Sequence, residues 1–551
     1  MKPIARLAMA IAVVAAWPVL ANARTALDAP GCASLAHLRI GPADIGLATS
    51  GARVTAASFI PADAQGHPAH CLVSGEIAPK TPAAPDIRFR VALPAAWNGK
   101  SLMFGGGGTD GFIPDVLGNQ LNMPSTAPTP LARGYAVFGS DSGHQGGGPD
   151  FGLNDEAWRN YLGDALKKTR DAATLIVTRA YATPPKRAYF LGTSRGGAEG
   201  LVVAARWPAD WDGVVSLYPA RNPLFTVFGL LAANQALAQP GAYPTVEKRA
   251  LMYRAALERC DQLDGAKDGV ISNVAGCHKV FDPSTATVDG AALRCGAGVA
   301  TKPNCLSDAE LAAYRAIEAP VDLPVPLGGE TVFPGFNAYT SDVGRPGSSP
   351  AQTHSTALGF GFRPPSSPMQ QGMPMSWGLA DPFVRIVILR DSAANPLRLD
   401  LKHLGPVADR IKALAVLHDS DLGMSGFARK HGKILLMHGT DDMLVTPRGT
   451  EAYYRRLRSQ LGGKAVDGML RFYEAPGFGH SQSAIFGVEW DYLAALESWV
   501  EHGVDPSQRE VMTDTTGVPG RTRPLCRYPR WPKYRGSGDI NAAASFSCSL
   551  R

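Results

Sequence analysis

The chain has 551 residues, of which 45% are hydrophobic and 19% charged, and its formal net charge is +6 at pH 7. This composition excludes a fibrous or disordered protein, and so small a charge gives no reason to expect nucleic acid as a partner. The length would allow about three or four domains, but α/β enzymes with insertions exceed that ratio, so we expect one enzyme core with additions.

Residues 1–23 are typical of a secretory signal peptide. Basic Lys2 and Arg6 precede an apolar stretch at 7–20, and residues 21–23 (ANA) form a small-x-small cleavage site. A membrane anchor is the alternative, but the stretch is shorter than the ~20 residues of a spanning helix. We therefore expect export to the periplasm or beyond, and no membrane association after cleavage. Because the compartment is oxidising, the eight cysteines are expected to form four disulfides.

Short apolar runs alternate with helix-like periodicity along two parts of the chain. The expected strands are residues 87–104 with a break at Pro94, 135–140, 187–191, 214–217, 433–437 and 471–474. The expected helices are residues 161–181, 196–207 and 488–502. Such alternation indicates a mostly parallel sheet with helices on both faces.

The alternation lapses in a long central segment that is rich in Pro and Gly and holds four of the eight cysteines. We interpret this segment as a lid inserted into the core. The predicted organisation is a signal peptide at 1–23, the first part of the core at 24–221, the inserted lid at 222–427, the second part of the core at 428–513 and a disulfide-tied tail at 514–551.

The sequence Gly192-Thr193-Ser194-Arg195-Gly196 fits the G-x-S-x-G motif, and it follows a predicted strand and precedes a predicted helix. A serine on such a turn projects its hydroxyl from the sheet edge, and the flanking glycines avoid a Cβ clash. The helix N-terminus favours negative charge that develops there. An ordinary glycine-rich turn is the alternative, but this context favours a nucleophile.

A nucleophilic serine needs a base and an acid that orients the base, and in this fold they follow in the order Ser, Asp or Glu, His. The loop after the strand at 433–437 contains Asp441 and Asp442, and the spacing from Gly439 favours Asp442. His480 lies in a glycine-rich turn before the last predicted helix. We therefore predict Ser194 as nucleophile, His480 as base and Asp442 as the orienting acid.

An acyl-transfer reaction also needs donors for the tetrahedral oxyanion. The backbone N–H of Arg195 is expected to be one donor. The second is expected from the glycine loop at 105–108, at either Gly107 or Gly108. A phosphate-binding loop is excluded here because no G-K-[ST] follows.

Residues 260–271 (CDQLDGAKDGVI) bring three carboxylates close together in sequence. Oxygen ligands at short spacing suit Ca²⁺, although the spacing is not that of an EF-hand. A solvated acidic turn is an equal alternative on these residues alone. The predicted ligands are the side chains of Asp261, Asp264 and Asp268 and the backbone carbonyls of Ala266 and Val270.

The chain resembles the tannase and feruloyl esterase family, which includes mono(2-hydroxyethyl) terephthalate hydrolases. Six ordered blocks carry the resemblance: PAHCLVSGEI, LPAAWNGK with the glycine loop, GYAVFGSDSGH, GTSRGGAEG with WPADWDGVV, CDQLDGAKDGV, and RPLCRYPRWPKYRGSGDINAAASFSC. The resemblance implies an α/β-hydrolase fold with an inserted lid. It also implies that Ser194, Asp442 and His480 match the family's triad.

The resemblance further implies that the five calcium ligands named above match the family's structural calcium site. No organic cofactor is expected. The implied disulfide pairs are Cys32 with Cys71, Cys260 with Cys277, Cys295 with Cys305, and Cys526 with Cys548.

Two features bear on the site. The family's usual cysteines just before the nucleophile and just after the base are replaced by Thr193 and Ser481, so the triad must be aligned by packing and hydrogen bonds, including those hydroxyls. Trp377 resembles the family's lid tryptophan, and we expect it and Arg385 to bind substrate; a tryptophan in the lid's own core is the alternative. The Arg195 side chain is a further candidate for contacting an acidic substrate.

These observations predict an exported serine carboxylic-ester hydrolase that acts on small aromatic esters of the feruloyl, galloyl or terephthaloyl type. One alternative is another serine acyl hydrolase, such as a peptidase or polyester depolymerase. The other is a non-catalytic, calcium-stabilised binding protein on an esterase scaffold. The sequence does not define the oligomeric state.

Overall fold

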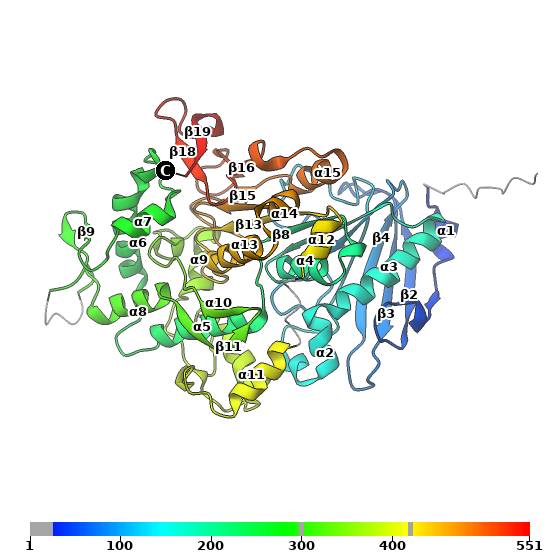
Figure 1. Cartoon of the computed structure of the whole chain (residues 1–551), viewed down its shortest axis with the longest axis horizontal. Helices are drawn as coiled ribbons and strands as arrows, with labels where there is room; N and C mark the ends of the chain where they lie inside the picture. Colours follow the sequence, from blue (N-terminus) through cyan, green and yellow to red (C-terminus); the bar gives the residue numbers. More distant parts are fainter. Residues whose placement is uncertain (1–25, 297–301, 417–422, 551) are drawn as a thin grey trace, which may run out of the picture.

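A computed structural model describes residues 26–296, 302–416 and 423–550, so the predicted signal peptide lies outside the described residues. Its central feature is a ten-stranded sheet in the order β1-β2-β3-β4-β6-β5-β7-β8-β13-β14 (Figure 1). These strands are β1 (Arg39–Ile40), β2 (Gly51–Ile60), β3 (His70–Ala78), β4 (Ile87–Pro94), β5 (Lys100–Phe104), β6 (Ala136–Ser140), β7 (Arg187–Thr193), β8 (Gly213–Leu217), β13 (Lys433–Gly439) and β14 (Leu470–Ala475).

The sheet has an antiparallel part and a parallel part. From β6 to β14 all neighbouring strands are parallel, whereas β1 to β4 are antiparallel and β4 also pairs antiparallel with β6. The parallel part confirms the predicted alternation of strands and helices and is an α/β-hydrolase arrangement. The antiparallel β2 and β3 were not among the predicted strands.

Side chains of successive strand residues enter two separate cores, one on each face of the sheet. In β13, Ile434 and Leu436 pack on one face, and Leu435 and Met437 on the other. Full burial of each such side chain contributes about 1.5 to 3 kcal/mol. The first face is covered by α3 (Ala165–Tyr181), α4 (Arg195–Arg206), α12 (Ser425–Arg429), α13 (Pro447–Leu461) and α14 (Gly463–Met469), and the second by α15 (Tyr492–His502).

Two predicted helices begin later than expected. A π-helical turn at Asn160–Asp164 precedes α3, so the regular helix starts at Ala165. Residues Val488–Glu489 form the short strand β15, and α15 begins only after Asp491, whose side chain accepts a hydrogen bond from the N–H of Ala494. An N-cap of this kind fixes where a helix starts.

The segment between β8 and β13 leaves the sheet, as predicted for an insertion, and none of its described strands joins the ten-stranded sheet. In Figure 1 it lies on the side of the molecule away from β2–β4. Its elements are α5 (Pro223–Leu237), α6 (Val246–Cys260), α7 (Val274–Val280), β9 (Thr287–Val288), β10 (Ala291–Ala292), α8 (Asp308–Glu318), β11 (Val321–Leu327), β12 (Glu330–Phe333), α9 (Pro350–Gly359), α10 (Met375–Phe383) and α11 (Val407–Val416).

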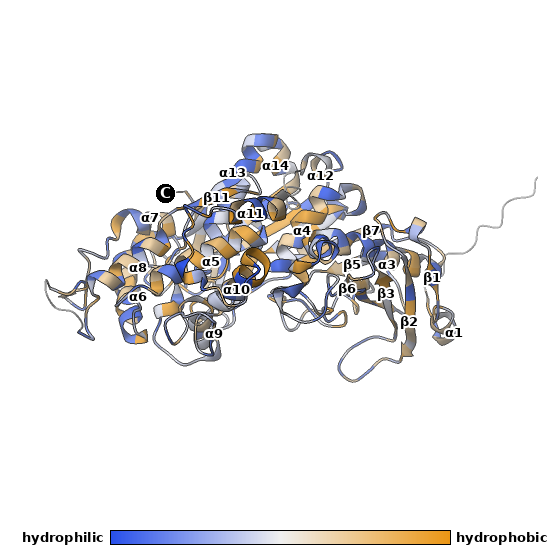
Figure 2. Ribbon diagram, turned by 90° about the horizontal axis from the view of Figure 1, so that it is seen from below, coloured by the Kyte–Doolittle hydropathy of each residue, from blue (hydrophilic) through white to orange (hydrophobic). Residues whose placement is uncertain are grey.

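The insert has its own hydrophobic core. Helix α5 is apolar almost all round and lies beside α10, where Figure 2 shows hydrophobic residues on both helices. A helix that is apolar on every side must be buried. At its far end, near the predicted boundary at 427, Met424 and Phe427 pack with the core of the sheet.

Short elements complete the chain. They are α1 (Ala29–Ala33), α2 (Asp155–Arg159), β16 (Val511–Asp514), β17 (Thr522–Pro524), β18 (Trp531–Tyr534) and β19 (Phe546–Ser549). The four predicted disulfides are present: Cys32–Cys71, Cys260–Cys277, Cys295–Cys305 and Cys526–Cys548. Over the part of the chain that the structure describes, no helix is both long and apolar enough to cross a bilayer.

Candidate active site

Ser194 lies on a sharp turn between β7 and α4. Its backbone has φ 56° and ψ −119°, a conformation that L-residues rarely adopt. A Cβ on Gly192 would lie 2.2 Å from the carbonyl oxygen of Gly196, and a Cβ on Gly196 would lie 2.6 Å from that of Gly106. Only glycine fits at either position, so the motif's spacing has a steric cause.

The structure brings the three predicted triad side chains together. Ser194, Asp442 and His480 follow β7, β13 and β14, whose carboxyl ends meet at the same edge of the sheet. Nε2 of His480 lies 2.8 Å from Oγ of Ser194. Nδ1 of His480 lies 2.7 Å from Oδ2 of Asp442. This is the hydrogen-bonded chain that an activated serine requires.

Asp442 is the residue of the acidic pair that faces the base. Its Oδ1 accepts hydrogen bonds from the N–H groups of Leu444 and Val445 at 2.9 and 2.8 Å, and Oδ2 also lies 3.2 Å from Nε2 of His438. Burial raises the pKa of Asp442, but the charge of His480 and the histidine hydrogen bonds outweigh it and hold the pKa well below its usual range. Asp442 is therefore ionised and can orient an imidazolium.

Asp441 has a different environment. It accepts a hydrogen bond from the Thr440 hydroxyl at 2.8 Å, and no hydrogen bond joins it to His480 in the described structure. Burial and the negative charge of Asp342 raise its pKa well above the ordinary value. The geometry thus matches the sequence preference for Asp442.

Three backbone N–H groups are available near the nucleophile. Among the described residues, the N–H groups of Arg195, Gly107 and Gly108 donate to no protein acceptor. The Gly107 carbonyl accepts from the N–H of Asp110 at 2.8 Å, which closes a turn in the glycine loop. These are the predicted oxyanion donors, and the structure leaves both Gly107 and Gly108 as candidates.

A chain of polar contacts links the residue before Ser194 with the residue after His480. The Tyr218 hydroxyl contacts Thr193 and donates to Oδ1 of Asn122 at 2.9 Å. Nδ2 of Asn122 donates to the carbonyls of Val488 at 2.9 Å and Ser481 at 3.5 Å. Polar contacts therefore connect Thr193 to Ser481, where the family's usual cysteines are replaced.

The insert reaches this site through α9. Nε2 of His354 lies 3.3 Å from Oγ of Ser481, and His354 is half-buried. Burial, together with the positive charge of His480, lowers the pKa of His354. Sequence patterns gave no signal for His354, Tyr218 or Asn122, because their roles come from contacts between segments far apart in the chain.

Three side chains expected to bind substrate are used elsewhere. Trp377 is fully buried in the insert core, and its indole N–H donates to the carbonyl of Ser366. Arg385 donates to the buried carboxylate of Asp381 at 2.9 Å. The Arg195 guanidinium is 1% exposed and stacks on the ring of Tyr161. Trp377 thus lies in the lid's own core, the alternative that the sequence left open. The guanidinium groups of Arg385 and Arg195 are bonded within the protein, and substrate binding by Trp377 and Arg385 stays a prediction.

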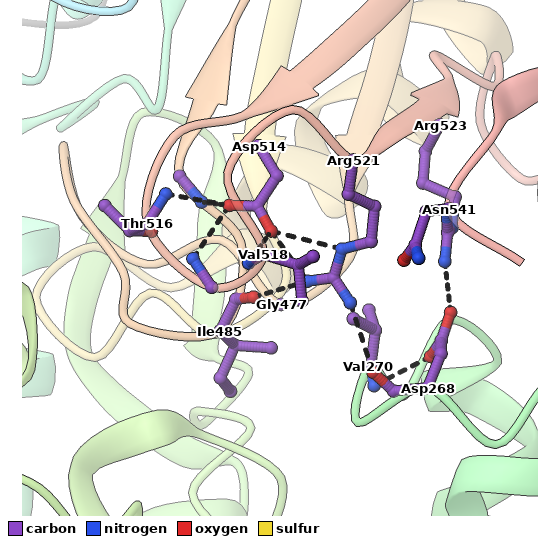
Figure 3. Close-up of polar contacts among 12 residues, drawn as sticks. Asp268, Val270, Gly477, Ile485, Asp514, Thr516, Val518, Arg521, Arg523 and Asn541 are labelled. Atoms are coloured by element: carbon purple, nitrogen blue, oxygen red, sulfur yellow. Dashed lines mark hydrogen bonds and ion pairs between the residues drawn. The ribbon is translucent and has the colours of Figure 1, made fainter.

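The predicted calcium loop packs against the tail, as Figure 3 shows. Arg523 forms an ion pair with the carboxylate of Asp268, and Nη1 of Arg521 donates to the Asp268 carbonyl at 3.1 Å. Arg521 is itself held by Asp514 at 2.8 Å. Across the described ranges, no three His, Cys, Asp or Glu side chains converge on a position for a metal ion.

Comparison with known proteins places the chain. The model of the family described as tannase and feruloyl esterase matches residues 71–549. The chain belongs to the tannase and feruloyl esterase family. It is 37% identical over 537 residues to an uncharacterized esterase of Agrobacterium fabrum, covering 94% of this chain and 93% of that protein.

The chain is also similar to a second curated protein and to a solved structure. A mono(2-hydroxyethyl) terephthalate hydrolase of Piscinibacter sakaiensis is 31% identical over 545 residues, covering 89% of this chain and 86% of the relative. The crystal structure of feruloyl esterase B from Aspergillus oryzae has a TM-score of 0.74 at 21% identity, covering 95% and 100% of the two chains, and shares the fold. The protein is a carboxylic ester hydrolase.

Proposed function

We propose that this family member is a serine esterase that hydrolyses esters of aromatic carboxylic acids, of the feruloyl, galloyl or terephthaloyl type. The observation that carries the proposal is the continuous chain of hydrogen bonds from Ser194 through His480 to Asp442. The names of the family and of the terephthalate relative support the aromatic acyl group.

In the proposed reaction each group has one role. His480 takes the proton of Ser194 through Nε2 as the hydroxyl oxygen attacks the ester carbon. Asp442 fixes the imidazole tautomer through Nδ1 and stabilises the cation. The N–H groups of Arg195 and of Gly107 or Gly108 bind the oxyanion, each contributing about 3 to 4 kcal/mol in comparable sites. The alcohol leaves with a proton from His480, and water then releases the acid from the acyl-enzyme.

A hydrolysis screen tests the substrate class. The wild type and Ser194→Ala are assayed on methyl ferulate, methyl gallate and mono(2-hydroxyethyl) terephthalate, with methyl hexanoate and a peptide anilide as comparisons. We expect kcat/KM to be highest on one of the aromatic esters and activity to be lost in the serine variant. Preference for the aliphatic ester or the anilide would reject the aromatic-ester proposal.

Calcium binding by the 261–270 loop is a second part of the proposal. Oδ2 of Asp264 is buried and has no hydrogen-bond partner among the described residues. Ala266 and Val270 are buried, and their carbonyl oxygens accept no hydrogen bond from any residue that the structure describes. Orphaned buried oxygens of this kind are rare, and hard oxygen ligands suit Ca²⁺.

The charges of the loop agree with this fit. Burial raises the pKa of Asp264 to about 7 and also raises the pKa of Asp261. A divalent cation would stabilise both ionised carboxylates. Asp261, Asp264 and Asp268, whose carboxylates do not converge on one position in the described structure, would turn toward the ion and hold it together with the two carbonyls. Asp268 would then share its carboxylate between the metal and Arg523.

Export is the third part of the proposal. The four disulfides support it, since such bonds persist in oxidising compartments. N-terminal sequencing of the protein isolated from its native host tests the predicted cleavage after Ala23. A mature protein that still begins at Met1 would reject the signal-peptide assignment.

A further inference from the structure

A cluster of charged side chains lies directly behind the glycine loop of the oxyanion site. Glu199 and Arg195 come from α4, and Asp110 follows the glycine loop. Their exposed fractions are 0%, 1% and 2%, respectively. The proposed reaction uses only the backbone of Arg195, so the three buried charges have no role in the chemistry described so far. Burying a charged group costs free energy unless an opposite charge and hydrogen bonds compensate it.

Glu199 is bonded to the glycine loop itself. Its Oε2 accepts a hydrogen bond from the N–H of Gly106 at 2.9 Å, and its Oε1 accepts one from the Ser142 hydroxyl at 3.3 Å. Because α4 also begins with the residue after Ser194, this contact ties the loop to the helix that carries the nucleophile. The Gly106 peptide directly precedes Gly107, so fixing it restricts the direction of the donor N–H groups.

Asp110 also lies against Gly106. A Cβ on Gly106 would come within 2.1 Å of Oδ1 of Asp110. Oδ2 of Asp110 lies 3.5 Å from Nε of Arg195, and neither carboxyl oxygen accepts a hydrogen bond from the described residues. Two carboxyl groups thus lie against the loop, and one of them lacks hydrogen-bond donors.

Burial and neighbouring charges act on the titratable groups of this cluster. Arg195 is the cation of the cluster, and the other titratable groups that face it are Tyr161 and His144. Burial and the charge of Glu199 raise the pKa of Asp110 well above its ordinary value. Burial lowers the pKa of His144 to about 4, so it is neutral at pH 7.

We propose that Glu199 and Asp110 are positioning residues for the oxyanion site: Glu199 accepts the hydrogen bond of the Gly106 N–H, and Asp110, which lies against Gly106 and 3.5 Å from Nε of Arg195, limits the movement of the same residue. Together they aim the following glycine N–H groups at the acyl oxygen. This inference rests on the proposed esterase function. Donors directed at the oxyanion act mainly in the transition state, so the pair sets kcat and leaves KM nearly unchanged.

Substitution of Glu199 provides the first test. Glu199→Gln keeps the shape but gives the cluster an amide in place of the charge. We expect kcat on the best aromatic ester to fall about 10- to 100-fold, somewhat less than the loss of a whole oxyanion donor, with KM within about twofold. The matched control is Glu156→Gln, because Glu156 is also buried and accepts two backbone hydrogen bonds, from Lys80 and Thr81.

Two substitutions of Asp110 test its contact with Gly106. Asp110→Asn keeps the size of the side chain and is expected to retain most of kcat, whereas Asp110→Ala removes the side chain from Gly106 and is expected to lose as much kcat as Glu199→Gln. If Asp110→Ala keeps the kcat of the wild type, the positioning role of Asp110 is wrong. Inhibition by an arylboronic acid, which forms a tetrahedral adduct on a serine, should weaken in parallel with kcat.

The outcomes separate this inference from the function on which it rests. A wild type that hydrolyses none of the aromatic esters rejects the proposed function. An active wild type with an equally active Glu199→Gln rejects only the positioning role. If Glu199→Gln does not fold, as judged by circular dichroism, Ser142→Ala decides. That variant removes one donor to Glu199 and is expected to lower kcat about threefold at constant KM; an unchanged kcat overturns the proposal.

Discussion

The edge-to-face contact between Tyr218 and His480, with ring centroids 4.9 Å apart, places the tyrosine directly against the proposed base. The hydroxyl of the same tyrosine bonds Asn122 and contacts Thr193. Tyr218 therefore connects the turn that holds the nucleophile with the loop that holds the base, by polar contacts where the family usually has a disulfide.

Removal of the Tyr218 hydroxyl should loosen this connection without removing the ring. We expect Tyr218→Phe to lower kcat about 5- to 10-fold, which corresponds to about 1 kcal/mol, with little change in KM. Steady-state kinetics on the best ester measures both. Tyr181→Phe is the matched control, because its buried hydroxyl donates to the Pro94 carbonyl at 2.7 Å in the sheet core. Equal kcat losses in the two variants would mean that only general stability is affected.

The glycine before the nucleophile should tolerate no side chain. A Cβ on Gly192 would lie 2.2 Å from backbone, whereas a Cβ on Gly468 in α14 would meet nothing within 4 Å. We expect Gly192→Ala to lower the melting temperature by more than about 10 °C or to prevent folding. Gly468→Ala should raise stability by about 0.5 to 1 kcal/mol because alanine favours the helix. Calorimetry of both variants checks this, and a Gly192→Ala protein with wild-type stability would contradict the turn geometry.

Stability should fall in mild acid because of His144. Its Nε2 lies 2.8 Å from the Thr109 carbonyl, its Nδ1 is buried without a partner, and burial lowers its pKa from 6.5 to about 4. Between these values the unfolded chain binds a proton that the folded chain does not. The contribution of His144 is therefore complete above pH 6.5 and is lost as the pH falls toward 4, by up to roughly 3 kcal/mol.

Urea unfolding at several pH values measures this contribution. His144→Gln, whose amide still donates to Thr109, should show a flatter dependence of unfolding free energy on pH than the wild type between pH 7 and about 4. Parallel curves for the two proteins would show that His144 does not contribute to the acid sensitivity.

Removal of calcium should destabilise the protein. We expect EGTA to lower the melting temperature by several degrees, added Ca²⁺ to restore it, and Mg²⁺ not to, because Mg²⁺ demands a tighter octahedral site. Asp264→Asn removes the carboxylate with the orphaned oxygen and should abolish the response to EGTA. If the purified protein contains no metal and EGTA leaves the melting temperature unchanged, the calcium site is rejected. The loop would then be held by the Arg523–Asp268 ion pair instead.

The parts of the molecule that are coded locally could be predicted from the sequence. Ser194 is defined by a five-residue motif between a strand and a helix, and Asp442 and His480 lie in loops after apolar strands in the order that the fold requires. The disulfide pairs were implied by family resemblance and are present. Each of these depends on short-range pattern or on a shared family motif.

Contacts between distant segments could not be predicted. Trp377 was expected to bind substrate, but an aromatic residue in a helix does not reveal whether its face is covered, and here the insert core covers it. Arg195 turns its side chain into the Asp110 and Glu199 cluster, because two elements far apart in sequence meet there. Strands β2 and β3 were not predicted, although β3 alternates buried and half-buried residues along its length.

The central claim is that Ser194 is the activated nucleophile of an ester hydrolase. A fluorophosphonate reacts covalently with such a serine, and digestion with mass spectrometry locates the adduct. We predict one adduct per chain, on Ser194, with hydrolysis lost in step with labelling, and strongly reduced labelling in His480→Ala. Hydrolysis that survives complete labelling, or an adduct that is absent from Ser194 in an active wild type, would contradict the account.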